Sequence, residues 1–475
     1  TNASSASSAY VVTVDTAAPT ITIDQIATDD TLNASETGSP LVVSGTTTAE
    51  DGQTVTLTVN GKTFAGLVSG GEYSIGLSAK EVSTLTGTET FAVNVSDVAA
   101  NAATEVTRDL TVDTTGPTIT AVATSGTGIS SGDGNLNAGD AVTITLTASA
   151  ATTISGGTPT LSLSGGGQAT YSSGSGSTSL VFSYTVASGE NTADLEVIGF
   201  NTGGATLEDA EGNALVTSGS IADPTGDLLI DTTVPTVTSV VASGSGISNG
   251  SGDQKQSEAI TLTVNTSEAI TVDTTGGTPA LTLNTGDTVN YASGSGSSAL
   301  VFTYTIGAGD NVDDLQIVGF ALNGGTFRDS AGNDLSTGPI VTNPVGILVV
   351  DTTAPSAPVI TAISDDTGTE GDKITSDTSL TISGTGEVGA SVQVSLGGSE
   401  VGSAVTVDSD GNWSYTHDST LSAGDHSFTA VATDAATNAS SASSAYVVTV
   451  DTAAPTITID QIATDDTLNA SETGS

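Results

Sequence analysis

The sequence predicts an all-β fold, made of tandem immunoglobulin-like β-sandwich domains that form an elongated rod. Thr, Ser, Gly and Val dominate the 475 residues, and these residue types favour strands and turns over helices. Apolar and polar residues alternate with a period of two in short runs such as 54–59 and 391–396. This alternation, bounded by Gly, Ser, Asn and Asp, is typical of short antiparallel strands. The segment 78–85 predicts one helical turn at most.

A short acidic motif divides the chain into domain-sized units. Its five copies read Asp-Thr-Ala-Ala-Pro at 15–19, Asp-Thr-Thr-Gly-Pro at 113–117, Asp-Thr-Thr-Val-Pro at 231–235, Asp-Thr-Thr-Ala-Pro at 351–355 and Asp-Thr-Ala-Ala-Pro at 451–455. Successive copies start 98, 118, 120 and 100 residues apart, which is about the size of one immunoglobulin-like sandwich. Proline fixes its own φ and keeps the preceding residue extended, so we expect short, stiff junctions.

We therefore expect four complete domains between two incomplete segments. The predicted ranges are 1–18 as the last strand of a preceding domain, 19–115, 116–233, 234–353 and 354–453 as the four domains, and 454–475 as the start of a next repeat. Residues 437–475 repeat residues 1–39 without a change. This repetition, together with the missing Met, suggests a fragment of a protein that cycles a four-domain unit.

The charge balance restricts the partners of the chain. Six Lys and Arg residues face 53 Asp and Glu residues, which gives a net charge of −47. Nucleic acid and anionic membranes both attract clustered basic residues, so neither is expected as a partner, and no apolar run suggests membrane insertion. Two interpretations of the acids remain: a surface that keeps the chain soluble, or carboxylates that divalent cations neutralise. The chain has no cysteine, so bound calcium could stabilise the domains where disulfides do not.

Three recurrent groups of residues could bind calcium, which takes about six to eight oxygen ligands from Asp, Glu, Asn and backbone carbonyls. The first group is the junction acid: Asp15, Asp113, Asp231, Asp351 and Asp451. The second is a loop that precedes the last strand of each domain: Asp97 and Asn101, Asp209 and Asn213, Asp329 and Asn333, Asp434 and Asn438. The third is an acidic loop early in each domain: Asp30 and Glu36, Asp140, Glu258, and Asp366.

Sandwich topology predicts which of these groups meet. The Asp–Asn loop would join the last two strands, at the end of the sandwich where the chain enters, so it should face the junction Asp that leads into its own domain. The early acidic loop would lie at the opposite end and face the next junction. The alternative is that Asp and Asn only form turns there. Three carboxylates held together without a cation would, however, repel each other and raise their pKa values.

The Asp-Thr-Thr-x-Pro junctions, the Asp-x-x-Gly-Asn loops and the Gly-rich β repeats resemble bacterial Ig-like extender repeats of giant RTX (repeats-in-toxin) biofilm adhesins, which are exported by type I secretion. The resemblance covers the whole chain. It implies an extracellular row of domains, rigid only with Ca²⁺, whose partners are the neighbouring repeats of the same monomeric chain. The rest of such a protein anchors it at a Gram-negative outer membrane. The Gly-Gly-x-Gly-x-Asp nonapeptides of the RTX region are absent from this sequence.

No residue pattern indicates an enzyme. The two histidines, His417 and His426, lie on a predicted hairpin and form no Ser-His-Asp set. Trp413 is predicted to fill the core of the fourth domain, with stacking on a sugar as the alternative. We therefore predict a structural extender of a cell-surface adhesin. The alternative function is a carbohydrate- or cell-surface-binding module within such an adhesin.

Overall fold

The computed structural model describes residues 7–217, 221–338 and 343–460. The expected ends at 1–18 and 454–475 fall partly on residues 1–6 and 461–475, which lie outside the described residues. Helical structure in the described part is limited to α1 (Ala79–Val82), within the segment expected to form one turn, and the 3-10 turn η1 (Ser164–Gly166). No helix among these residues is long and apolar enough to cross a membrane.

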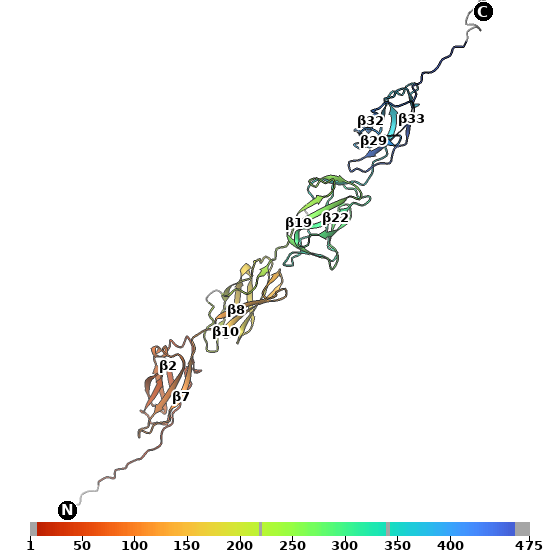
Figure 1. Cartoon of the computed structure of the whole chain (residues 1–475). Helices are drawn as coiled ribbons and strands as arrows, with labels where there is room; N and C mark the ends of the chain where they lie inside the picture. Colours follow the sequence, from red (N-terminus) through yellow and green to blue (C-terminus); the bar gives the residue numbers. More distant parts are fainter. Residues whose placement is uncertain (1–6, 218–220, 339–342, 461–475) are drawn as a thin grey trace, which may run out of the picture. The chain divides into compact units, whose positions relative to one another are not determined.

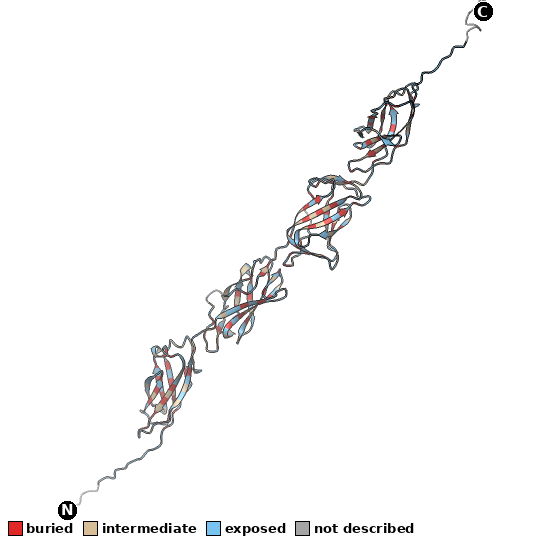
Figure 2. Ribbon diagram, in the orientation of Figure 1, coloured by how far each residue is buried: buried red, intermediate tan, exposed pale blue. Residues whose placement is uncertain are grey.

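Four hydrophobic cores follow one another along the described residues, and we number the sandwiches around them 1 to 4. The cores extend from Ile21 to Leu110, from Val122 to Ile230, from Val240 to Val350 and from Ile360 to Val450. Buried and exposed residues alternate along the strands of each sandwich, because successive side chains of a strand point to opposite faces (Figure 2). The prediction of an all-β chain of sandwiches is confirmed.

Sandwich 1 pairs a five-stranded sheet with a two-stranded sheet. Its strands are β1 (Thr31–Leu32), β2 (Leu41–Thr46), β3 (Thr54–Val59), β4 (Lys62–Leu67), β5 (Glu72–Leu77), β6 (Gly87–Val95) and β7 (Val106–Val112). The larger sheet has the order β1-β7-β6-β3-β4, and β2 pairs with β5.

Sandwich 2 is built around one long strand that pairs with three other strands. Its strands are β8 (Ile119–Ser125), β9 (Gly134–Leu136), β10 (Ala141–Ser155), β11 (Thr160–Leu163), β12 (Gln168–Ser173), β13 (Ser177–Thr185), β14 (Val197–Asn201), β15 (Thr206–Glu208) and β16 (Leu228–Ile230). The main sheet has the order β14-β11-β12-β13-β10-β15, and β8 also pairs with β10.

Sandwich 3 repeats this arrangement. Its strands are β17 (Val237–Ser243), β18 (Gly252–Gln254), β19 (Ala259–Asp273), β20 (Ala280–Leu283), β21 (Thr288–Ser293), β22 (Ser297–Thr305), β23 (Ile317–Ala321), β24 (Thr326–Arg328) and β25 (Leu348–Val350). Strands β19 and β22 lie side by side and antiparallel (Figure 1).

Sandwich 4 resembles sandwich 1 in its shorter strands. They are β26 (Val359–Ile363), β27 (Ile374–Thr375), β28 (Thr381–Thr385), β29 (Ser391–Leu396), β30 (Ser399–Glu400), β31 (Val405–Thr406), β32 (Asn412–Thr416), β33 (Gly424–Thr433) and β34 (Tyr446–Val450). Trp413 on β32 is buried in this core, as predicted, and its indole N–H donates to the carbonyl of Thr385 at 3.1 Å.

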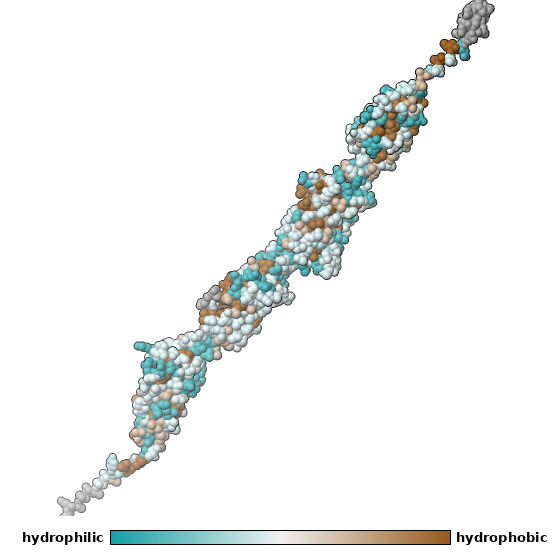
Figure 3. Space-filling view, in the orientation of Figure 1, coloured by the Kyte–Doolittle hydropathy of each residue, from teal (hydrophilic) through white to brown (hydrophobic). Residues whose placement is uncertain are grey.

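One pairing recurs in every sandwich. A short early strand runs parallel to the last strand, in the pairs β1–β7, β9–β16, β18–β25 and β27–β34. Each last strand ends immediately before a junction Asp. The surface around these elements is mostly polar or near neutral on the face shown in Figure 3, with hydrophobic residues in small, separate areas.

Candidate metal sites at the domain junctions

Four of the five junction Asp residues are joined to the preceding sandwich through their backbone N–H groups. Asp113 N donates to the carbonyl of Leu32 at 3.1 Å, which extends the β1–β7 ladder by one bond. The corresponding bonds are Asp231 to Leu136 at 2.9 Å, Asp351 to Gln254 at 2.9 Å and Asp451 to Thr375 at 2.8 Å. The parallel ladder therefore fixes the position at which each junction begins.

The side chain of each junction Asp forms a turn with the residue two positions later. One carboxylate oxygen, Oδ1, accepts the backbone N–H of that residue, a recurrent Asx turn. The pairs are Asp15 with Ala17 at 3.0 Å, Asp113 with Thr115 at 2.9 Å, Asp231 with Thr233 at 2.8 Å, Asp351 with Thr353 at 2.9 Å and Asp451 with Ala453 at 2.9 Å. The turn chemistry considered as the alternative to calcium is therefore present at all five junctions, and it uses one of the two carboxylate oxygens.

The Asp–Asn loops are closed by hydrogen bonds within the loop. In sandwich 2, Asp209 Oδ1 accepts the backbone N–H of Asn213 at 2.7 Å, and Asp209 Oδ2 accepts its side-chain N–H at 3.3 Å. Asp97 with Asn101 and Asp434 with Asn438 make the same two bonds. The hydrogen bond from the Asn101 side chain is the main reason why the pKa of Asp97 lies below its ordinary value. The Asp97 carboxylate is consequently held as an anion.

Each Asn reaches the junction acid that the topology assigns to it. Its Nδ2 donates to the backbone carbonyl of that Asp, in the pairs Asn101 with Asp15 at 3.2 Å, Asn213 with Asp113 at 3.1 Å, Asn333 with Asp231 at 2.9 Å and Asn438 with Asp351 at 2.8 Å. The structure therefore brings the first two groups of predicted residues together, through an Asn amide and a backbone oxygen. Metal binding by these residues stays a prediction.

The early acidic loops make different contacts. Their acids accept backbone N–H groups of their own loops: Glu36 from Asn33 at 3.0 Å, Asp140 from Asn137 at 2.9 Å, Glu258 from Lys255 at 3.1 Å and Asp366 from Gly371 at 2.8 Å. Asp30 instead forms an ion pair with Arg108. Two of these loops contact the next sandwich through other groups: in sandwich 1, Ala34 N donates to Asn213 Oδ1 at 2.9 Å, and in sandwich 3, Lys255 Nζ donates to the carbonyl of Thr437 at 3.3 Å.

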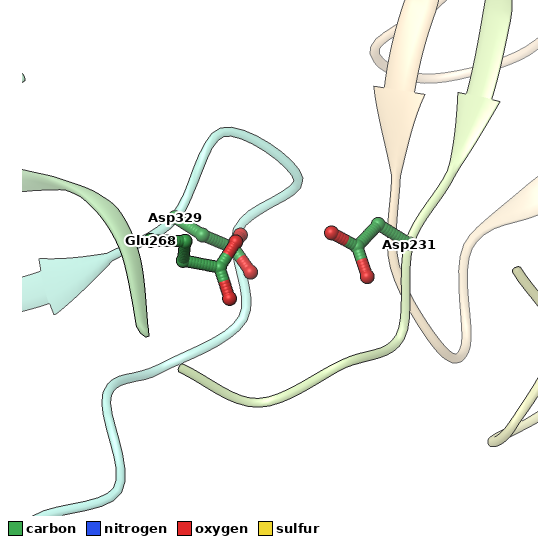
Figure 4. Close-up of side chains that lie close together, drawn as sticks. All are labelled: Asp231, Glu268 and Asp329. Atoms are coloured by element: carbon green, nitrogen blue, oxygen red, sulfur yellow. The ribbon is translucent and has the colours of Figure 1, made fainter. Parts of the chain in front are cut away.

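A glutamate that the sequence did not single out lies beside one of the predicted acids. Oxygen atoms of Glu268 and Asp329, both in sandwich 3, lie within 4.8 Å of each other, and Figure 4 shows the two carboxylates side by side; the view also labels Asp231. Asp329 is buried, with 4% of its surface exposed. In sandwich 1, Glu50 is placed similarly, because its carboxylate accepts the N–H of Val98 in the Asp97–Asn101 loop at 3.1 Å.

Residues 353–452, which hold sandwich 4, match the bacterial Ig-like domain family. No curated protein matches the sequence.

The solved structures that match this chain include adhesins. A Ca²⁺-stabilized adhesin that helps an Antarctic bacterium reach out and bind ice is 24% identical, with 91% of this chain and 99% of that chain covered and a TM-score of 0.41. A tetra-tandem repeat in the extending region of a large adhesion protein is 20% identical, with 92% and 100% covered and a TM-score of 0.31. An immunoglobulin-like domain of the M. primoryensis ice-binding adhesin is 36% identical over 20% of this chain and 96% of its own, with a TM-score of 0.17.

The groups that meet at the entrance of sandwich 4 are all oxygen donors apart from one amide nitrogen. They are the carboxylate and carbonyl of Asp351, the carboxylate of Asp434 and the side chain of Asn438. Oxygen donors of this kind suit a hard cation such as calcium, and sulfur and imidazole, which softer metals prefer, are not among them. The residues present therefore fit calcium by their chemistry.

Proposed function

We propose that this chain is an extender segment of a secreted bacterial adhesin. In this role a row of Ig-like domains, stiffened by calcium at the junctions, projects a ligand-binding tip for surface attachment or biofilm formation. The observation that carries the proposal is the double attachment of three junction residues, Asp113, Asp231 and Asp351. Asp113, for example, donates its N–H to Leu32 of the preceding sandwich and accepts a hydrogen bond from Asn213 of the next one. A residue held from both sides limits bending at the junction.

In this proposal the domains are those predicted from the sequence: 19–115, 116–233, 234–353 and 354–453. The junction Asp and the acid of the following Asp–Asn loop supply carboxylates to the ion, as Asp113 and Asp209 or Asp351 and Asp434 would, and in sandwich 3 Glu268 lies beside Asp329. The Asn residues position the junction carbonyl, since their Nδ2 groups donate to it. The early acids Glu36, Asp140, Glu258 and Asp366 shape their own loops, in which each accepts a backbone N–H.

Calcium, when bound, would neutralise these carboxylates and draw them together. Without it, their like charges oppose close approach, and a chain with a net charge of −47 has few basic residues to offset them. An ion that binds only the folded and docked state stabilises that state by linkage, by about 2.7 kcal/mol at a concentration 100 times the Kd. Free calcium would therefore set both the stiffness of the junctions and the stability of the sandwiches.

The proposed location is the cell exterior, with the remainder of the parent protein attached to the outer membrane and the neighbouring repeats as the partners of each domain. A carbohydrate-binding module is the competing function. Trp413 is the single Trp of the sequence, and it is 3% exposed, so its ring offers no stacking surface to a sugar. This burial favours the structural role.

Small-angle X-ray scattering tests the proposal directly. We expect the maximum dimension of the chain to be larger and better defined in millimolar CaCl₂ than in excess EDTA, because bound ions restrict the junctions. MgCl₂ at the same concentration is the matched control, since it screens the charges equally but demands a smaller, octahedral site. Identical scattering in CaCl₂ and MgCl₂ would remove calcium from the mechanism and leave an acidic spacer.

A further inference from the structure

The parallel pair formed by the early strand and the last strand of each sandwich lies between the two points where the chain enters and leaves. In sandwich 1, Thr111 N donates to the carbonyl of Asp30 at 3.0 Å and Asp113 N to that of Leu32 at 3.1 Å. The chain enters ahead of β1 and leaves after β7. Tension along the chain therefore slides these parallel strands past each other and loads their hydrogen bonds together rather than one at a time.

A side-chain link crosses this strand pair in sandwich 1. Arg108 on β7 donates from Nε to Asp30 Oδ1 at 2.6 Å and from Nη2 to Asp30 Oδ2 at 2.5 Å, and Asp30 immediately precedes β1. The side chains are 33% and 25% exposed, so the pair is partly removed from water. A two-bond Arg–carboxylate pair of this kind is among the stronger side-chain contacts and is fixed in geometry.

Sandwich 4 has a different link at the same position. Lys373 immediately precedes β27, and its Nζ lies 4.2 Å from the centroid of the Tyr446 ring. Tyr446 is the first residue of β34, the last strand of the sandwich. A cation over the face of an aromatic ring is attracted by the ring's electrons, so this contact also ties the early strand to the last strand.

Sandwiches 2 and 3 cross the same strand pair without a basic residue. Asp227 N donates to Asp133 Oδ1 at 2.9 Å, and Ile347 N donates to Ser251 Oγ at 3.1 Å. Their parallel pairs are longer, with three matched residues in β9–β16 and in β18–β25 against two in β1–β7 and in β27–β34. The links that use a basic residue thus occur where the backbone ladder is shorter.

The scarcity of basic residues makes this placement informative. The chain has six Lys and Arg residues among 475, and two of them, Arg108 and Lys373, take part in side-chain links between the early and the last strand, one from each side of the strand pair. We propose that the parallel terminal strands are the clamp that resists tension in each sandwich, and that Asp30–Arg108 and Lys373–Tyr446 reinforce the clamp in sandwiches 1 and 4. The clamp acts within a sandwich and needs no calcium; only the source of the tension rests on the proposed extender function.

Single-molecule pulling of the full chain in EDTA tests the clamp. The sequence has no cysteine, so Thr16→Cys and Thr114→Cys provide two unique attachment points that stretch sandwich 1 from its ends. We expect Arg108→Met to raise the unfolding rate at constant force about ten-fold or more, the usual effect of losing hydrogen bonds to a charged group. Lys80→Met is the control, because it removes an exposed basic residue of the same sandwich, and it should change the rate no more than about two-fold.

A second pair of attachment points distinguishes an effect of Arg108→Met on the clamp from an effect on the stability of the whole sandwich. Anchors at Lys62→Cys and Glu72→Cys load β4 and leave β1 and β7 outside the stretched segment, so Arg108→Met should leave that unfolding rate unchanged. Equal acceleration from both pairs of anchors would show that Arg108 stabilises the whole sandwich, and no acceleration from either would show that the link bears no load. Either result overturns the proposal. Loss of calcium stiffening would not affect these measurements, because they are made in EDTA.

If Arg108→Met prevents folding of sandwich 1, sandwich 4 supplies the same test. Ala354→Cys and Thr452→Cys stretch it from its ends, and Lys373→Met removes the contact with Tyr446 while leaving the ring in place. Faster unfolding of the variant at constant force supports the clamp. An unchanged rate contradicts it for this sandwich.

Discussion

The side chain of Asn213 bonds to the backbone of Asp113, 100 residues earlier in the chain. Its Nδ2 donates to the Asp113 carbonyl at 3.1 Å, while its Oδ1 accepts the N–H of Ala34 at 2.9 Å. Asn213 is 2% exposed. One buried amide thus pairs with two backbone groups, the N–H of Ala34 in sandwich 1 and the carbonyl of Asp113 directly after sandwich 1. Removing the amide would take this hydrogen-bond partner from both groups.

Asn213→Ala should therefore weaken this junction in a way that can be located. We expect the variant to lower the free energy of unfolding by about 1–3 kcal/mol, the cost of leaving buried polar groups unpaired. Hydrogen exchange of the Ala34 amide should become faster, because it loses its acceptor. Asn60→Ala is the control, since Asn60 bonds Thr84 within sandwich 1. Unchanged exchange at Ala34 would show that the link does not form in solution.

Glu268→Gln should have opposite effects with and without calcium. In EDTA the variant should be slightly more stable than the wild type, because it removes a negative charge close to Asp329. In calcium it should gain less stability, with a Kd weaker by at least about ten-fold, since even a supporting residue around a metal contributes that much. Melting curves in both buffers check this prediction. Glu400→Gln on the exposed β30 is the control, and an equal gain in both buffers would exclude Glu268 as a ligand.

Acid should destabilise sandwich 1 through Asp30. The pKa of Asp30 lies below its ordinary value of 3.8 in the folded state. The largest cause is the hydrogen bonding from Arg108, which outweighs the opposite effect of burial. A carboxyl whose pKa is lower when folded contributes stability above its unfolded pKa and loses it as the pH falls through the folded value. Denaturant unfolding of sandwich 1 in EDTA, from pH about 5 to about 2, should show this loss. Arg108→Met should flatten the curve, and an unchanged pH dependence would contradict the ion pair.

Gly45→Ala should destabilise sandwich 1 because there is no room for a methyl group. A Cβ at Gly45 would lie 2.1 Å from the Thr22 carbonyl oxygen and 2.7 Å from the hydroxyl oxygen of Tyr73, which donates to that same carbonyl. Overpacking of this kind costs about 1–3 kcal/mol. Gly76→Ala on the adjacent β5 is the matched control, since no atom lies within 4 Å of its Cβ position. Equal stability of the two variants in denaturant unfolding would contradict this packing.

The sandwich fold and the meeting of Asp113 with Asn213 could both be anticipated from the sequence. Alternation with a period of two identifies strands, and the junction motif recurs at the spacing of one domain. The connection of the last two strands then places the Asp209–Asn213 loop at the entrance of its own sandwich. Residues far apart in the sequence could be paired because one topology repeats.

The contacts of the other acids could not be predicted from the sequence. An acid that caps its own loop, as Glu36 does with Asn33, has the same sequence appearance as a metal ligand. Asp30 is paired with Arg108, 78 residues later, and only the register of β1 against β7 brings them together. Glu268 could not be recognised as part of a repeated pattern, because the corresponding residue of sandwich 2 is Ala150.

The scarcity of basic residues has a further consequence for the segments between sandwiches. None of the five Asp-Thr-x-x-Pro motifs contains Lys or Arg, although exposed extended segments are where proteases usually cut. An enzyme that cleaves after basic residues finds no bond to cut in these linkers. The six basic residues lie within the ranges of the sandwiches instead, and two of them, Arg108 and Lys373, stand at paired strands, where digestion requires the sandwich to open first. The composition that makes the chain acidic thereby also shields its most accessible segments from trypsin-like enzymes.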